Sequence, residues 1–125
     1  MNVVLWVLQI LLALVFAGSG LVKLNQSRSQ LLANANMAWV QDVPQPLVKT
    51  IGALEVLGAL GLILPPVLDI APVLTPVAAT GLALIMVGAM ILHTRRRERQ
   101  IIVLNVLLLV LAAIVAWGRF GPWSF

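Results

Sequence analysis

Long apolar runs alternate with short polar segments along this chain. Four runs, at about 3–24, 47–64, 73–93 and 101–118, match the roughly 20 apolar residues that a helix needs to cross the hydrocarbon layer. The runs are continuous and lack the alternating pattern of a membrane β-barrel. Backbone amides in lipid can otherwise be satisfied only within helices. The pattern predicts an all-α, four-helix transmembrane bundle forming one domain, residues 1–125.

The segments between the runs differ in length. The second loop, LPPVLDIAP, and the third, around TRRRERQ, are short, so the helices that each one joins should be antiparallel neighbours. Pro65 and Pro66 are expected to end one helix, and Pro72 to begin the next. The first loop is longer, and Leu31, Leu32, Ala35 and Trp39 recur in it at helical spacing. It forms either a short helix lying in the membrane interface or an ordered loop that caps the bundle.

Charge distribution sets the expected orientation. The chain is 62% hydrophobic and 10% charged, with a net charge of +4. Basic residues gather beside the first and third loops, which places both loops in the cytoplasm and both termini outside a cell (inner or plasma) membrane. The basic run HTRRRER is a topology signal with some attraction to anionic lipid, and we expect no nucleic-acid partner. The first apolar run has no basic segment before it, so we interpret it as a span and not as a cleaved signal.

Several kinds of chemistry are absent from the composition. The chain has no cysteine, which excludes disulfides, thiol redox relays and cysteine-bound metals. It has one histidine, which argues against a multi-histidine haem or metal site. Ser19, His93 and Glu55 could be drawn as a hydrolase triad, but no sharp strand-to-helix turn surrounds the serine. We therefore expect no catalytic residues and no metal.

A single glutamate interrupts the apolar run IGALEVLGALGLILP, residues 51–65. A charged side chain deep in a membrane costs at least about 2.5 kcal/mol, so Glu55 must be paired, hydrated or protonated. At about 100° per residue, Gly52, Glu55 and Ala59 share one helix face. Small residues beside the carboxylate let a neighbouring helix approach closely. We expect Glu55 to face protein, on the cytoplasmic side of the membrane.

The other three predicted spans bring polar atoms to the same leaflet, whereas the outer half holds only Gln9 and Thr75 or Thr80. Lys23 ends the first span, His93 ends the third, and Asn105 lies about one turn into the fourth. This asymmetry predicts a cytoplasmic-side pocket lined by Glu55, Lys23, His93, Asn105, Ser19, Met86 and Met90. The alternative is a Glu–Lys or Glu–His pair that only fixes the helix register.

Four segments carry a resemblance to a known family: FAGSGLVKL, IGALEVLGALGLILP, IMVGAMILHTRR and LVLAAIVAWGR. In order and spacing they resemble the DoxX-like family of small four-helix membrane proteins, over nearly the whole chain. The resemblance implies the bundle fold. It also implies an association with quinone-linked thiosulfate oxidation or with membrane redox enzymes, as an anchor or quinone-proximal subunit.

Three functional hypotheses follow. In the first, a non-catalytic membrane protein binds a small amphipathic or quinone-like molecule, or a partner in a redox or stress complex, through the pocket around Glu55. A quinone or a lipid is then the candidate ligand. Gly81 and Gly88 lie seven residues apart on one helix face and offer a homodimer seam. This hypothesis predicts that Glu55→Gln abolishes binding and leaves folding intact.

The second hypothesis is a proton-coupled exporter like the small multidrug transporters, with Glu55 as the proton carrier. Against it, the chain has no tyrosine and its tryptophans were expected at the ends of the spans, so an aromatic cage for a cationic substrate would be missing. The third is a ligand-free membrane scaffold, in which the polar cluster sets the register and Glu55→Gln is strongly destabilising.

Overall fold

The chain folds into four long helices, with two short helical segments in the first loop. The computed structural model describes residues 2–33 and 35–124. The long helices are α1 (Asn2–Asn25), α3 (Gln45–Leu68), α4 (Leu74–Arg95) and α5 (Arg99–Phe120). Each is long and apolar enough to cross a membrane. The described residues contain no strand, so the predicted all-α, four-helix membrane bundle is confirmed.

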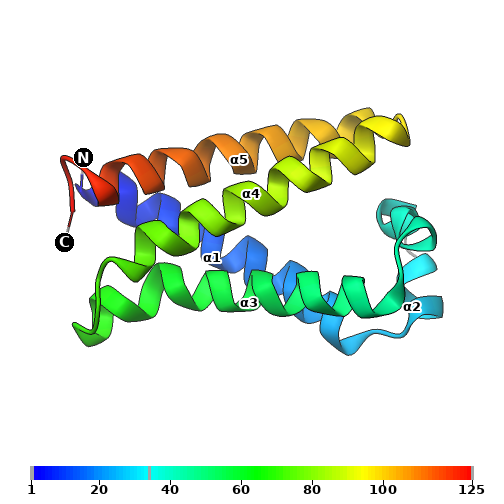
Figure 1. Ribbon diagram of the computed structural model, residues 1–125, viewed down its shortest axis with the longest axis horizontal. Coiled ribbons are helices and arrows are strands. Elements are labelled where there is room, and N and C mark those ends of the chain that lie inside the picture. Colours follow the sequence, from blue (N-terminus) through cyan, green and yellow to red (C-terminus); the bar gives the residue numbers. More distant parts are fainter. Residues whose placement is uncertain (1, 34, 125) are drawn as a thin grey trace.

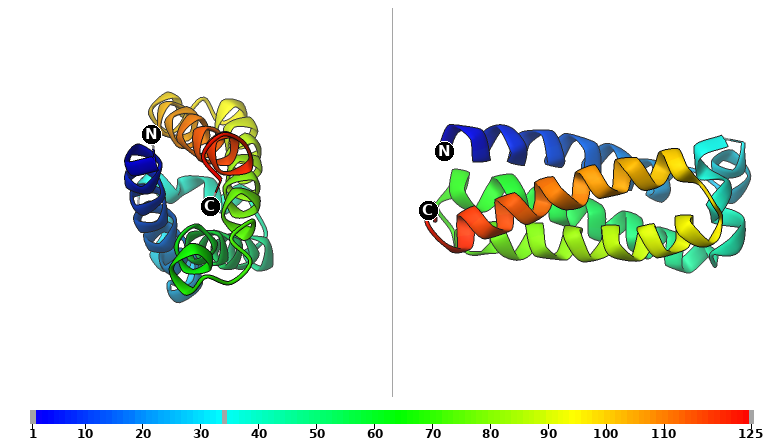
Figure 2. Two further views of the ribbon diagram at one scale, coloured as in Figure 1. Left: turned by 90° about the vertical axis from the view of Figure 1, so that its left-hand side faces the viewer. Right: turned by 90° about the horizontal axis from the view of Figure 1, so that it is seen from above.

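The long helices form two antiparallel pairs. α1 packs along α3, and α4 packs along α5, while α3 also packs against α4. Viewed from the end that holds both termini, the helices are arranged in the cyclic order α1, α3, α4, α5 (Figure 2). The α4–α5 pair diverges from the α1–α3 pair toward the opposite end, where the first loop lies (Figure 1).

Glycines set the closest helix contacts. A Cβ atom added at Gly20 of α1 would lie 2.5 Å from the carbonyl oxygen of Gly52 in α3, so no larger residue fits without movement. Gly58 of α3 is similarly covered by the side chain of Leu82 in α4. Membrane helices associate through close backbone approach at small residues, because lipid tails provide no hydrophobic force between them. The α1–α3 pair is therefore held in one register by its glycine contact.

The expectation that Pro65 and Pro66 end a helix is wrong. Both residues lie inside α3, which continues to Leu68 and ends where Asp69 adopts a left-handed conformation with φ 55°. A proline lacks the N–H that would bind the carbonyl four residues earlier. A helix can continue through such a site only if the freed carbonyls find other donors.

Side chains from two neighbouring helices supply those donors. The carbonyl freed by Pro65 is that of Gly61, and Thr75 Oγ1 of α4 donates to it at 3.0 Å. The carbonyl freed by Pro66 is that of Leu62, and Gln9 Nε2 of α1 donates to it at 2.7 Å. Polar side chains in the half of the bundle that holds the termini thus satisfy the backbone of α3.

The first loop caps one end of the bundle. It contains α2 (Arg28–Leu32) and the 3₁₀ helix η1 (Ala35–Asp42). Leu31, Trp39 and Val40 are buried and pack with Val48 of α3, whereas Leu32 is exposed. The side chain of Ala35 lies outside the described part of the structure. Of the two alternatives for this loop, the capping arrangement is the one observed.

Candidate ligand-binding site

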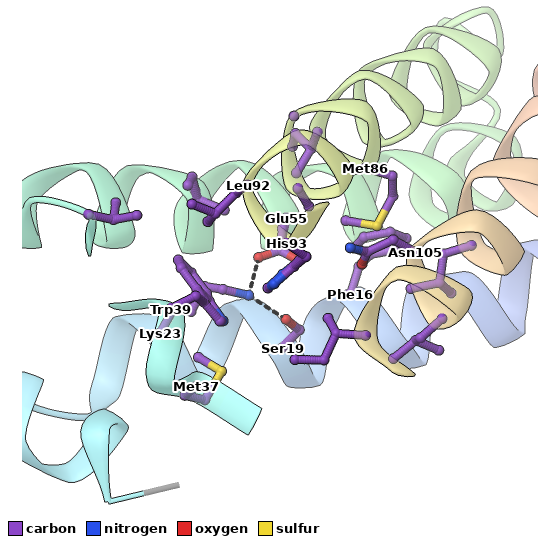
Figure 3. A pocket seen from close by; sticks show the side chains of 18 of the residues that line it. Phe16, Ser19, Lys23, Met37, Trp39, Glu55, Met86, Leu92, His93 and Asn105 are labelled. Carbon is purple, nitrogen blue, oxygen red and sulfur yellow. Dashed lines mark hydrogen bonds and ion pairs between the residues drawn. The ribbon is translucent and has the colours of Figure 1, made fainter. Parts of the chain in front are cut away.

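Lys23 and Glu55 form a buried ion pair between α1 and α3 (Figure 3). Lys23 Nζ lies 2.6 Å from Glu55 Oε1 and also donates to Ser19 Oγ at 2.6 Å. The face of the Trp39 ring covers the ammonium group, with 5.8 Å between Nζ and the ring centroid. The side chains of Lys23 and Glu55 are 8% and 2% exposed. Two hydrogen bonds and a cation–π contact therefore compensate the buried charge of Lys23.

The backbone around Lys23 is fixed by a second lysine. Lys49 Nζ of α3 donates to the carbonyl oxygens of Lys23, Leu24 and Gln26, at 2.7, 2.9 and 2.7 Å. The last carbonyls of a helix have no partner within it, and a lysine nearby both binds them and complements the helix dipole. Together with the Gly20–Gly52 contact, this cap holds Lys23 at the height of Glu55.

His93, at the end of α4, pairs with a different carboxylate. Its Nδ1 atom lies 2.9 Å from Glu98 Oε1, and its ring meets the Trp39 ring edge-on, with centroids 6.0 Å apart. The Glu–His pair considered for Glu55 is therefore formed by Glu98, and Glu55 takes Lys23. With Nδ1 turned to the carboxylate, a neutral His93 ring presents Nε2 as an acceptor.

Arg96 joins the α4–α5 turn to the first loop. Its Nε donates to Glu98 Oε1 at 3.0 Å, and its Nη1 donates to the carboxylate of Asp42 in η1. The hydrogen bond to Asp42, followed by that to Glu98, raises the pKa of Arg96 above its ordinary value. This pair fastens η1 across the end of the bundle next to His93.

A cavity of about 720 Å³ lies between the two helix pairs, beneath η1. This volume is within the range of about 300 to 1,000 Å³ typical of small-molecule sites. Its lining is mainly apolar and includes Phe16, Met37, Met86 and Leu108. Six of the seven predicted site residues line it: Ser19, Lys23, Glu55, Met86, His93 and Asn105.

Met90 is the exception among the predicted site residues. It lies in a separate surface groove of about 430 Å³, together with Leu109 of α5 and Arg95. Met86 and Met90 are four residues apart on α4, and the extra rotation of about 40° turns Met90 out of the cavity, to the side facing α5.

Asn105 is the polar group of the cavity that the fold leaves unused. The residue is 5% exposed, and its Nδ2 atom is buried with no hydrogen-bond partner among the described residues. A buried donor without a partner costs about 1 to 3 kcal/mol. Asn105 lines the cavity near Phe16 and Met86 (Figure 3), so the amide is available to a molecule held there.

Sequence reasoning missed Trp39 as a site residue. The sequence places it in the first loop and assigns it no role in the pocket, yet its ring contacts both Lys23 and His93. Its helical spacing with Leu31 was the available signal, but 3₁₀ geometry in this loop turned the ring inward in a way that spacing does not predict.

A second polar cluster lies at the opposite end of the bundle. Arg119 is 3% exposed and donates to Gln9 Oε1, Asn2 Oδ1 and the carbonyl of Trp123, at 2.7, 2.7 and 2.8 Å. Its guanidinium also lies over the Trp6 ring. The half of the bundle that holds the termini is thus more polar than the sequence indicates, because the span predicted at 101–118 stops just before Arg119. Its contacts tie α1 to α5.

The described residues contain no group of three or more histidine, cysteine, aspartate or glutamate side chains that could hold a metal ion. No curated protein matches the chain, and neither does any solved structure. The family model of the DoxX-like family matches residues 7–115, which include all of α3 and α4, most of α1 and α5, and every residue of the polar cluster around Lys23 and Glu55. The chain belongs to the DoxX-like family.

Proposed function

We propose that this protein is a non-catalytic membrane receptor for a small amphipathic molecule, held in the cavity with its polar head at Asn105. The observation that carries the proposal is that Asn105 lines the cavity while its Nδ2 is buried with no hydrogen-bond partner among the described residues. Binding sites of this kind combine a largely apolar wall with a few polar groups that orient the ligand.

The charges around the cavity favour a neutral head group. Lys23 is already neutralised by Glu55 at 2.6 Å and donates to Ser19, so an anionic ligand would have to displace Glu55. The amide of Asn105 offers hydrogen to a neutral oxygen acceptor. A carbonyl-bearing, quinone-like ring between Phe16 and Met86 meets these conditions.

Each predicted residue that lines the cavity has a role in this proposal. Asn105 donates to the head group, and Lys23, Glu55 and Ser19 form the polar floor beside it. His93 presents its ring at the same end, held by Glu98 and Trp39. Met86 supplies flexible apolar contact.

Orientation and assembly are part of the same proposal. The basic residues beside the first and third loops favour a cell (inner or plasma) membrane with these loops in the cytoplasm and both termini outside. A homodimer would use Gly81 and Gly88, since a Cβ atom at either position would meet nothing within 4 Å in this chain. The proposed context is a membrane redox or stress complex. A receptor that holds a quinone-like molecule would supply that molecule to the complex.

Ligand binding is tested with the purified protein in lipid nanodiscs. The probes are decylubiquinone, whose head is neutral and carries carbonyls, and decanoate, whose head is anionic. Quenching of tryptophan fluorescence reports binding, and the part of the signal lost in Trp39→Phe is assigned to the cavity. We expect saturable quenching by decylubiquinone and none by decanoate. Absence of saturable quenching by decylubiquinone, or a preference for decanoate, would overturn the proposal.

Asn105→Leu separates binding from folding. Asn105 Nδ2 makes no hydrogen bond within the described chain, so the substitution should leave the free energy of unfolding unchanged or raise it. The affinity for decylubiquinone should fall about five- to ten-fold, since one hydrogen bond contributes about 1 to 1.5 kcal/mol. Met90→Leu, outside the cavity, is the matched control and should bind as the native chain does.

The two other functions make different demands on the ion pair. A proton-coupled exporter needs the Glu55 carboxylate to be free for its substrate, whereas here Glu55 Oε1 is held 2.6 Å from Lys23 Nζ in a buried ion pair. Flux of a lipophilic cation in proteoliposomes, driven by a pH gradient, decides that alternative. The scaffold is favoured by the buried pair itself, because Lys23 and Glu55 join two helices. It predicts that Asn105→Leu has no effect on any ligand.

A further inference from the structure

α1 and α5 meet at one end of the bundle and separate toward the other (Figure 1). At the end with the termini, Leu5 covers Gly118, where an added Cβ atom would lie 2.6 Å from the leucine side chain. One turn along α1 from Leu5, Gln9 accepts a hydrogen bond from Arg119 of α5. No such bridge between α1 and α5 is present beside the cavity in the described residues, where the two helices form facing walls.

Side chains and backbone pack across the other sides of the cavity. The Gly20–Gly52 contact seals α1 to α3. η1 covers the end next to the cytoplasmic loops with Trp39, which is 7% exposed. Between α3 and α4, Leu92 packs against the cluster that contains Val48. The side between α1 and α5 has no such packing among the described contacts.

Two apolar side chains mark this gap. Val15 of α1 and Leu104 of α5 both line the cavity, yet they are 43% and 51% exposed on the surface of the bundle. Leu104 precedes Gly118 by fourteen residues, about four helical turns, so it lies on the face of α5 that meets α1. Leu47 of α3 also lines the cavity and is 48% exposed, but on its side of the cavity Leu92 of α4 packs with the cluster that contains Val48. Val15 and Leu104 have no such packing described between them.

We infer that the cavity opens sideways into the bilayer between Val15 and Leu104, and that its ligand is a neutral lipid-soluble molecule that arrives through this gap from the membrane. The inference rests on the proposed function and adds the route. Both side chains at the opening are apolar, so a molecule already dissolved in the acyl chains passes without desolvating an ionised group. Asn105 directly follows Leu104 in α5 and also lines the cavity, where it receives the head group.

The test compares binding rates of decylubiquinone in nanodiscs by stopped-flow quenching of Trp39. The double variant Val15→Phe/Leu104→Phe narrows the gap. Its control, Leu14→Phe/Val103→Phe, adds the same side chains at adjacent positions that are 68% and 69% exposed and do not line the cavity. A third variant, Leu47→Phe, narrows the α3–α4 side instead, where Leu47 lines the cavity and is 48% exposed.

We expect the double variant to slow association and dissociation together by about ten-fold, which corresponds to a barrier raised by about 1.4 kcal/mol. The control and Leu47→Phe should keep the native rates. Native rates in the double variant, or slowing in Leu47→Phe alone, would overturn the inference while leaving the proposed function standing. Lack of saturable binding to the native chain refutes the proposed function, and the inference with it.

Discussion

Lys23 and Glu55 lie on different helices and meet at 2.6 Å inside the membrane-spanning part of the bundle. Their side chains are nearly fully buried, so each is the main compensation for the charge of the other. Removing one partner of such a pair leaves a buried charge alone, whereas replacing both with apolar residues is often close to neutral. The pair therefore contributes to helix register more than to net stability.

The first prediction concerns the charges of this pair. Glu55→Gln and Lys23→Met should each lower the free energy of unfolding by about 3 to 5 kcal/mol, because each leaves the other group buried without its counter-charge. The double variant Lys23→Met/Glu55→Leu should recover most of that loss. Unfolding in mixed micelles, followed by circular dichroism, provides the measurement. If the single and double variants are equally unstable, the two residues do not act as a pair.

This geometry changes one expectation drawn from the sequence. Glu55→Gln was expected to leave folding intact if the site binds a ligand, and to destabilise only if the cluster is a scaffold. Because Glu55 directly neutralises Lys23, both functions now predict instability for this variant. Asn105, which contributes no hydrogen bond from Nδ2 within the described chain, is the residue that distinguishes them.

A second prediction tests how closely α1 must approach α3. Gly20→Ala should lower the free energy of unfolding by about 1 to 3 kcal/mol, because the new methyl group overlaps the backbone of Gly52. It should also weaken the Lys23–Glu55 contact by moving α1 away. Gly18→Ala is the control, since a Cβ atom there meets nothing within 4 Å. The control should be neutral or stabilising, and equal losses in both variants would show that the contact is not tight.

Most of the fold and the core of the site could be predicted from the sequence for a physical reason. The membrane requires long apolar helices, and a lone glutamate in one of them must face protein. The spacing of Gly52, Glu55 and Ala59 then gave the buried face of α3, and all three are buried. These inferences depend only on helix geometry and on the cost of charge in lipid.

The remaining features depend on contacts between segments. The choice between Lys23 and His93 as the partner of Glu55 is set by the height at which α1 meets α3, which the Gly20–Gly52 contact fixes. Trp39 enters the site through a 3₁₀ segment with no strong periodicity. The continuation of α3 past Pro65 requires a donor from Thr75, fourteen residues away from Gly61, and local sequence carries no sign of it.

The third prediction concerns that donor. Thr75→Val should lower the free energy of unfolding by about 1 kcal/mol, because it leaves the Gly61 carbonyl without a hydrogen bond. In a Pro65→Ala background the restored N–H can bind the same carbonyl, so the loss should shrink. A double-mutant cycle measures the coupling. Thr80→Val is the control, since Thr80 binds only the carbonyl of Pro76 on its own helix. Zero coupling would contradict the assignment.

The last prediction addresses the Asp42–Arg96 pair, which holds η1 over the cavity. The chain has no cysteine, so a single cysteine at Val43, which is buried and lines the cavity, reports opening of this loop through its rate of maleimide labelling. Asp42→Asn should raise that rate a few-fold and no more, because Asp42 is half exposed and solvent-exposed ion pairs contribute little to stability.

The control for this experiment is Asp69→Asn, an exposed carboxylate at the opposite end of the bundle. Because pairing raises the pKa of Arg96, the guanidinium stays charged below the ordinary arginine value, and its own titration breaks the pair only as pH rises through the raised one. Titration of Arg96 therefore leaves the loop closed throughout the neutral range. A labelling rate that rises equally in Asp42→Asn and Asp69→Asn would mean that η1 is held by its buried residues alone, with Trp39 and Val40 as the anchors.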